Sequence, residues 1–274
     1  MFYMCQYIAE ETRTHDSAEF PARISPDLPA ALAGVGLGVL LPVTFFVIGL
    51  LTRAPAGNPL LSVEGLRRES IVDAVVLGIL VLTVTVLGGW RSVVIERRRF
   101  RSRTGVVILS AYALVTAVAF ARPVEADRGD YVVALALGVV LVALAEEILY
   151  RGVVVTGLRR VAPEWFVWLA SSTLFSLAHL SGGEVDVTHL VMTFVLGSAA
   201  YLARRVTGTL AAPVLVHALY NAFIGFRHQA EGGVPAVVSI GSTSLLFVAA
   251  VVGLVVAVGR PRDEASGRPA GLSR

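Results

Sequence analysis

The chain has 274 residues, of which 55% are hydrophobic and only 16% are charged, and its mean hydropathy is +0.75. Soluble domains carry about a quarter charged residues, so this composition excludes an ordinary water-soluble enzyme and indicates a polytopic membrane protein. The net charge is +3, and all of the positive charge comes from arginine, because the chain has no lysine. The use of arginine alone is typical of a high-GC prokaryotic genome. These arginines lie between apolar blocks rather than on one patch, which argues against nucleic-acid binding.

The apolar residues form eight blocks of about the length that crosses a hydrocarbon core of roughly 30 Å. We therefore expect an all-α bundle of about eight transmembrane helices. In chain order the blocks are 28–52, 71–90, 105–121, 131–150, 165–180, 187–203, 210–226 and 235–259. The fourth block stays apolar as far as Leu158, so we expect its helix to continue beyond the hydrocarbon.

The flanking segments are polar. Residues 1–27 lack the basic start of a signal peptide and are interpreted as a cytoplasmic lead, and residues 260–274 as a cytoplasmic tail. The bundle then spans 28–259, with the residues of chemical interest within 130–226. Cys5 is the only cysteine, which excludes an intrachain disulfide and a cysteine-based metal site.

The arginines also predict the orientation. With the amino terminus inside, sixteen of the 23 arginines fall on the cytoplasmic side, six fall outside, and Arg151 lies within a helix. Because cytoplasmic loops are enriched in arginine and lysine, we expect a multi-pass protein of the cell membrane with both termini in the cytoplasm.

Three charged residues, Glu146, Glu147 and Arg151, end the otherwise apolar fourth block. A charge at bilayer depth costs about 2.5–3.5 kcal/mol on insertion scales, so it is kept where it pairs or functions. Glu147 and Arg151 are four residues apart and can pair on one helix face, whereas Glu146 points about 100° away without a local partner. The alternative is that all three mark an ordinary interfacial helix end.

Polar residues also interrupt two later blocks. His179 follows Phe175 by four residues, and Asn221 follows His217 by four, so each pair shares a helix face. Taken alone, His179 is more typical of a structural hydrogen-bonding residue, and His217 with Asn221 equally fits polar contacts between helices.

The spacing around a turn brings these residues together. Glu146 lies 16 residues before Ala162, and His179 lies 16 residues after Pro163, so in a helical hairpin they have similar depth. One Glu, two His and one Asn in a membrane are suited to hydrolysis: Glu146 and His179 could activate water, while His217 and Asn221 could stabilise an oxyanion. However, His217 lies only nine residues after Gly208, so its helix must be recessed or broken near Pro213.

The ordered series Glu146-Glu147-x-x-x-Arg151, Phe175-x-x-x-His179 and His217-x-x-x-Asn221 resembles the motifs of the CAAX protease and bacteriocin-processing (CPBP) family. That family includes the type II CAAX prenyl endopeptidases. The resemblance covers roughly residues 130–226.

The resemblance implies an eight-helix intramembrane endopeptidase. Glu146, His179, His217 and Asn221 would be catalytic, supported by Glu147, Arg151 and Phe175. It implies a peptide or membrane-protein substrate in the bilayer, lipidated in some members. We expect no cofactor; the alternative is zinc held by Glu146, His179 and His217.

Other readings stay open. The zinc motif H-E-x-x-H and serine motifs such as G-x-S-x-G are absent from the sequence. A pair of intramembrane aspartates is also absent, since Asp73 is placed near the start of a span. A non-enzymatic scaffold or a transporter-like binding protein is the alternative function, although no internal repeat supports transport.

His189 is expected near the outer face in a structural role. We expect three aromatic residues to act as interfacial anchors: Tyr150, Trp165 and Trp168. Oligomeric state and substrate identity are left open.

Overall fold

A computed structural model describes residues 32–40, 43, 59–87, 89–96, 99–123, 128–182, 186–230 and 232–259, and these residues form a helical bundle. The predicted lead 1–27 and tail 260–274 lie outside the described residues. So does most of the first apolar block, of which residues 32–40 are helical.

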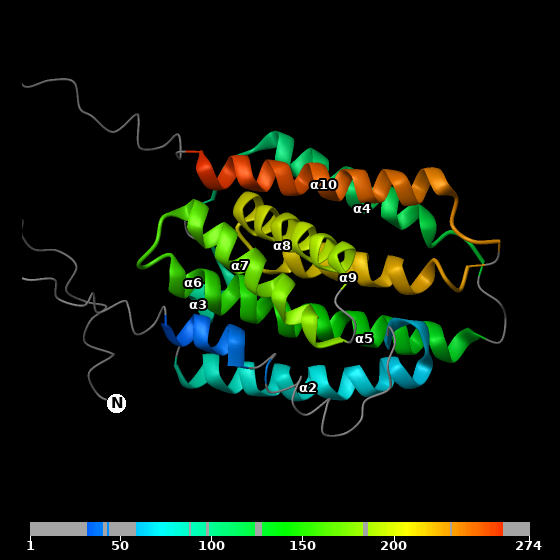
Figure 1. The fold of residues 1–274 in the computed structure, drawn as a ribbon, viewed down its shortest axis with the longest axis horizontal. Coiled ribbons are helices and arrows are strands. Elements are labelled where there is room, and N and C mark those ends of the chain that lie inside the picture. Colours follow the sequence, from blue (N-terminus) through cyan, green and yellow to red (C-terminus); the bar gives the residue numbers. More distant parts are fainter. Residues whose placement is uncertain are drawn as a thin grey trace, which may run out of the picture.

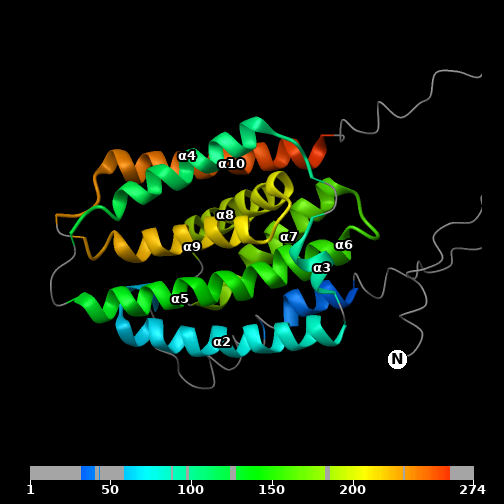
Figure 2. The same cartoon turned by 180° about the vertical axis from the view of Figure 1, so that it is seen from behind.

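The described helices follow the predicted blocks to within a few residues, except that α2 begins eight residues before its block. The longer ones are α2 (Val63–Val86), α4 (Arg103–Ala119), α5 (Gly129–Glu147), α7 (Glu164–Ala178), α8 (Val187–Thr207), α9 (Ala211–Phe226) and α10 (Ala236–Val258). In Figure 1 most of them run along the long axis, with α2 and α5 on one side, α4 and α10 on the other, and α8 and α9 between. Figure 2 shows the same layers from behind.

Length and composition agree with a membrane location. Four described helical segments are long and apolar enough to cross a bilayer: Val63–Val86, Gly129–Leu158, Val187–Thr207 and Ala236–Val258. Helices α4 and α9 are apolar but shorter. The chain is therefore an all-α polytopic membrane protein, and the count of eight spans stays a prediction.

Burial separates the outer helices from a central one. Ile71 of α2, Leu114 of α4 and Val255 of α10 are more than 60% exposed, as expected for side chains that face lipid. By contrast, 61% of the apolar window of α8 is buried inside the bundle, against 33% for α10. Helix α8 is thus the central element, against which α4, α7, α9 and α10 pack.

The helix that begins as α5 continues to Leu158, as expected, but through a π-helical segment. This segment, η5, covers Ile148–Val154 and leads into α6 (Val155–Leu158). The Val155 N–H donates to the carbonyls of Gly152 and Tyr150 and not to that of Arg151. The Arg151 carbonyl accepts a hydrogen bond from Arg204 instead.

Arg204 and the short helix α3 (Trp90–Val94) hold this π-helical segment in place. The Arg204 guanidinium is 1% exposed and also donates to the carbonyls of Ser92 (3.0 Å) and Val93 (2.9 Å). Val93 packs so closely on Gly152 that an added Cβ would lie 2.7 Å from its Cγ1 atom. Two other segments of the chain, α3 and the end of α8, therefore fix the path of the chain beyond Glu147.

An ion-pair network closes the same end of the bundle, next to the α6–α7 connection. Arg159 contacts Glu164 with 2.7 Å between Nη2 and Oε1, and it also pairs with Glu96. Burial alone would raise the pKa of Glu164, but the charges of Arg159 and Arg205, together with the hydrogen bonds from Arg159 and Tyr201, outweigh this effect and lower that pKa below its ordinary value.

Candidate active site

Glu147 is the fully buried carboxylate of the motif and contacts two partners. Its Oε1 atom accepts hydrogen bonds from Arg151 Nη1 at 3.0 Å and from His217 Nδ1 at 2.9 Å. All three side chains are 0–1% exposed. The pair with Arg151 was expected from the four-residue spacing, whereas the contact with His217 was not.

Glu146 is the less constrained carboxylate, as expected from its direction on the helix. Its side chain is 25% exposed, and its Oε2 atom lies 3.9 Å from His217 Nε2. That oxygen accepts no hydrogen bond within the described part of the chain. Asp73 of α2 lies close enough for its charge to interact with that of Glu146. Asp73 is in the middle of α2 rather than near the start of a span.

Phe175 connects the polar side chains of the site. Its ring is fully buried and lies 4.9 Å from the His179 ring and 5.5 Å from the His217 ring, between centroids. The Arg151 guanidinium stacks over the same ring at 4.3 Å. A single aromatic side chain therefore contacts both histidines and the buried cation, which extends the supporting role implied by the family resemblance.

His179 caps the carboxyl end of α7. Its Nδ1 atom lies 2.8 Å from the Phe175 carbonyl oxygen. Because a carbonyl can only accept, the proton of this bond is on Nδ1, and Nε2 is left with a lone pair in the neutral ring. No described hydrogen bond or ion pair joins His179 directly to Glu146; the two are linked through Phe175 and His217.

His217 is held in the same way by a group that only accepts. Its Nδ1–H donates to Glu147, so Nε2 is the nitrogen next to Glu146. Asn221 lies one turn later on α9 and is half-buried. No hydrogen bond joins its amide to another residue that the structure describes.

The different depths of the two turns explain how His217 reaches the motif glutamates. At the end of the bundle, the α6–α7 connection extends further than the α8–α9 connection in both Figure 1 and Figure 2. The recessed α8–α9 turn is anchored on the α3 segment, because Leu210 N–H donates to the Val94 carbonyl at 2.9 Å. His217 therefore meets the glutamates although fewer residues separate it from its turn.

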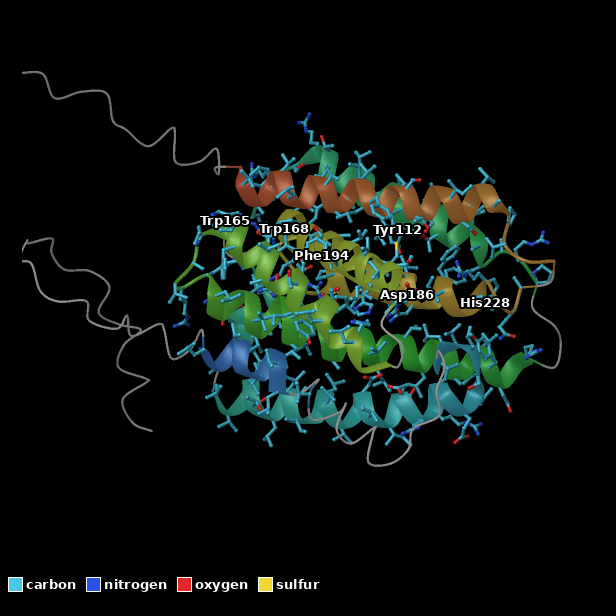
Figure 3. All side chains as sticks on the ribbon, in the orientation of Figure 1. Tyr112, Trp165, Trp168, Asp186, Phe194 and His228 are labelled. Carbon is cyan, nitrogen blue, oxygen red and sulfur yellow. The ribbon has the colours of Figure 1, made fainter. Side chains whose placement is uncertain are left out.

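Three side chains lie elsewhere than expected. His189 was placed apart from the site, but its ring centroid is 5.6 Å from that of His179. Tyr150, expected as an interfacial anchor, is 1% exposed and packs on Phe175. Trp168 packs beside Phe194 between α7 and α8 (Figure 3) and donates to Ser198 at 2.6 Å. Sequence periodicity could not identify these contacts, since each depends on a neighbouring helix.

The zinc alternative was tested against this geometry. The Nδ1–H of His217 donates to Glu147, which leaves Nε2 facing Glu146. The described residues include no set of three His, Cys, Asp or Glu side chains placed to share one ion, so Glu146, His179 and His217 do not form such a set in this structure.

Comparison with known proteins supports the resemblance over the segment that forms this site. Residues 128–223 match the family model described as type II CAAX prenyl endopeptidase Rce1-like. A comparison with curated proteins found no match. The matched segment runs from the start of α5 to near the end of α9 and contains every motif residue named above. This segment, about a third of the chain, is therefore similar to the CAAX protease and bacteriocin-processing family.

Proposed function

We propose that this protein is an intramembrane endopeptidase that hydrolyses a peptide bond with water activated by Glu146 and His179. The observation that carries the proposal is the cluster of Glu146, Glu147, His179 and His217 around the buried Phe175 ring. The cluster lies within the segment matched by the endopeptidase family model. The family match over residues 128–223 supports a CAAX-type protease, and the roles of the individual residues are our proposal.

Glu146 has the properties of a general base. Its side chain is 25% exposed, and its buried Oε2 atom accepts no hydrogen bond within the described residues, so this oxygen can take a proton from a water molecule that enters the site. His179 presents Nε2 as an acceptor, because Nδ1 is used on the Phe175 carbonyl. In the proposed step, the water hydrogen-bonds to both groups, gives its proton to Glu146, and forms a C–O bond to the substrate carbonyl carbon.

The tetrahedral intermediate requires donors for its oxyanion. His217 gives Nδ1–H to Glu147, so donation from Nε2 requires the doubly protonated ring, which Glu147 supports as a buried counter-charge. The Asn221 amide can supply a second donor from the same helix face. When the C–N bond breaks, Glu146 returns its proton to the departing nitrogen, which balances the reaction.

The test is hydrolysis of a quenched fluorogenic peptide that ends in a farnesylated CAAX motif, by the purified full chain in detergent. Glu146→Ala should lower kcat by about 10²–10⁴-fold, the usual contribution of general base catalysis. The matched control is Glu64→Ala, an exposed glutamate in the first turn of α2, which should cleave like wild type. Wild-type cleavage rates in Glu146→Ala would refute the mechanism.

Metal dependence is tested on the same peptide. We propose a metal-free reaction, so activity should survive prolonged chelation and dialysis. Activity that is lost on chelation and restored by zinc would overturn this part of the proposal. Mutation of Glu146 would still abolish cleavage in that case, so the two results separate the chemistry from the location of the site.

We further infer that the substrate is a lipidated or otherwise membrane-bound peptide and that both chain termini are cytoplasmic. The arginine distribution supports the orientation, since sixteen of 23 arginines then lie inside. A reporter fused after Arg274 should therefore be active only if it is functional in the cytoplasm. Trapping with Glu146→Ala, followed by mass spectrometry of the retained peptides, would identify the substrate.

A further inference from the structure

His189 lies in the first turn of α8 and its ring rests on that of His179, with 5.6 Å between centroids and 60° between planes. Hydrogen bonds hold the two helix ends together. Ser176 donates to the Leu190 carbonyl at 2.8 Å, and Thr193 donates to the Ser176 hydroxyl at 3.3 Å. Because Leu190 directly follows His189 on α8, these bonds fix the two helix ends that carry the imidazoles.

His179 needs such a contact because of where it lies. Helix α7 ends at Ala178, and the His179 ring is only half-buried. It is restrained by the Nδ1 hydrogen bond to the Phe175 carbonyl, by the Phe175 ring at 4.9 Å and by the His189 ring. Of these three restraints, His189 is the one that comes from a different helix, so it ties the His179 ring to α8.

We propose that His189 is a positioning residue of this site, whose ring keeps the His179 imidazole oriented so that Nε2 meets the attacking water. The inference rests on the proposed function, in which His179 orients that water. Nearby, the Asp186 carboxylate accepts from Thr188 N–H at 2.8 Å and caps α8. The His189 side chain makes no hydrogen bond within the described residues, so the contact of its ring with His179 is the feature that acts.

Substitutions that keep or remove the ring test this role on the farnesylated CAAX peptide. His189→Phe should retain kcat within about twofold, whereas His189→Gln and His189→Ala should each lower kcat about tenfold with KM unchanged, as expected for a misoriented catalytic group. His228→Gln, an exposed histidine beyond α9, is the control. Wild-type kcat in His189→Ala, or a loss in His189→Phe equal to that in His189→Ala, would overturn the proposal.

A second measurement does not depend on cleavage. The chain has five histidines, so ¹⁵N-imidazole NMR of the full protein in nanodiscs can be assigned by single substitutions. His179 should show one fixed Nδ1–H tautomer in wild type and in His189→Phe, and averaged tautomers in His189→Ala. An unchanged His179 spectrum in His189→Ala refutes the positioning role. Failure of wild type to cleave the peptide counts against the proposed function, while the spectra still decide the role of His189.

Discussion

Neutralising Glu147 should be among the most damaging single changes in the bundle. Glu147→Gln keeps the shape of the side chain but removes the charge that faces Arg151. The Arg151 guanidinium is fully buried, and its Nε and Nη2 atoms have no hydrogen bond within the described residues. After the substitution the cation would keep its contact with the Phe175 ring but lose its ion-pair partner. Breaking a buried ion pair from one side costs about 3–5 kcal/mol, and we expect a loss of that size.

The double variant Glu147→Gln with Arg151→Met separates the lost attraction from the stranded charge. Removing both charges of a buried pair is often close to neutral, so the double variant should recover most of the stability and unfold within about 1–2 kcal/mol of wild type. The Arg204 bond to the Arg151 carbonyl uses the backbone and should persist in all variants. The expected coupling energy is therefore at least about 2 kcal/mol.

Reversible unfolding in mixed micelles, followed by tryptophan fluorescence in wild type, both single variants and the double variant, measures this coupling. A loss below about 1 kcal/mol in Glu147→Gln would refute the reasoning, because that is the range of exposed ion pairs. So would a double variant as unstable as the sum of the single variants.

Three further predictions concern separate parts of the bundle. Phe175→Ala should destabilise the protein by about 3–5 kcal/mol and lower kcat at least tenfold, since both histidines of the site lose their shared contact; unfolding and peptide hydrolysis measure the two effects. Gly152→Ala should cost about 1–3 kcal/mol, because its Cβ would meet Val93 Cγ1 at 2.7 Å, and Gly152→Ala with Val93→Ala should restore stability. The pKa of Glu164 is lowered from 4.5, so the stability it provides should be present above pH 4.5 and lost as the pH falls below that value; in Glu164→Gln this acid dependence should be smaller in unfolding measured across pH.

The helices were predicted well from the sequence, because the rule for membrane-spanning segments is simple. The blocks 187–203 and 210–226 correspond to α8 and α9 almost residue for residue, since an apolar run must be helical to satisfy its backbone in a bilayer. The same logic marked Glu146 and Glu147 as costly residues that require partners. Spacing of four then indicated the pair with Arg151 that the structure contains.

The contacts between helices could be predicted less well from the sequence. Periodicity tells which residues share a face, but not how one helix is rotated against another, so the bond between His217 and Glu147 could not be predicted. The contact of His189 with His179 depends on the hydrogen bond from Ser176 to α8. No sequence motif predicts that bond. The π-helical winding of η5 was also unpredicted, since its apolar sequence fits an ordinary α-helix equally well.

The π-helical segment Ile148–Val154 sets the direction of everything beyond it relative to Glu147. A π turn takes up about one residue more than an α turn, so the same residues wound as an ordinary α-helix would turn the chain beyond them by about 100°. Gly152 would then no longer face Val93, and the Arg151 carbonyl would point away from Arg204. The wider winding therefore aligns the motif glutamates with the stretch of chain that α3 and Arg204 hold.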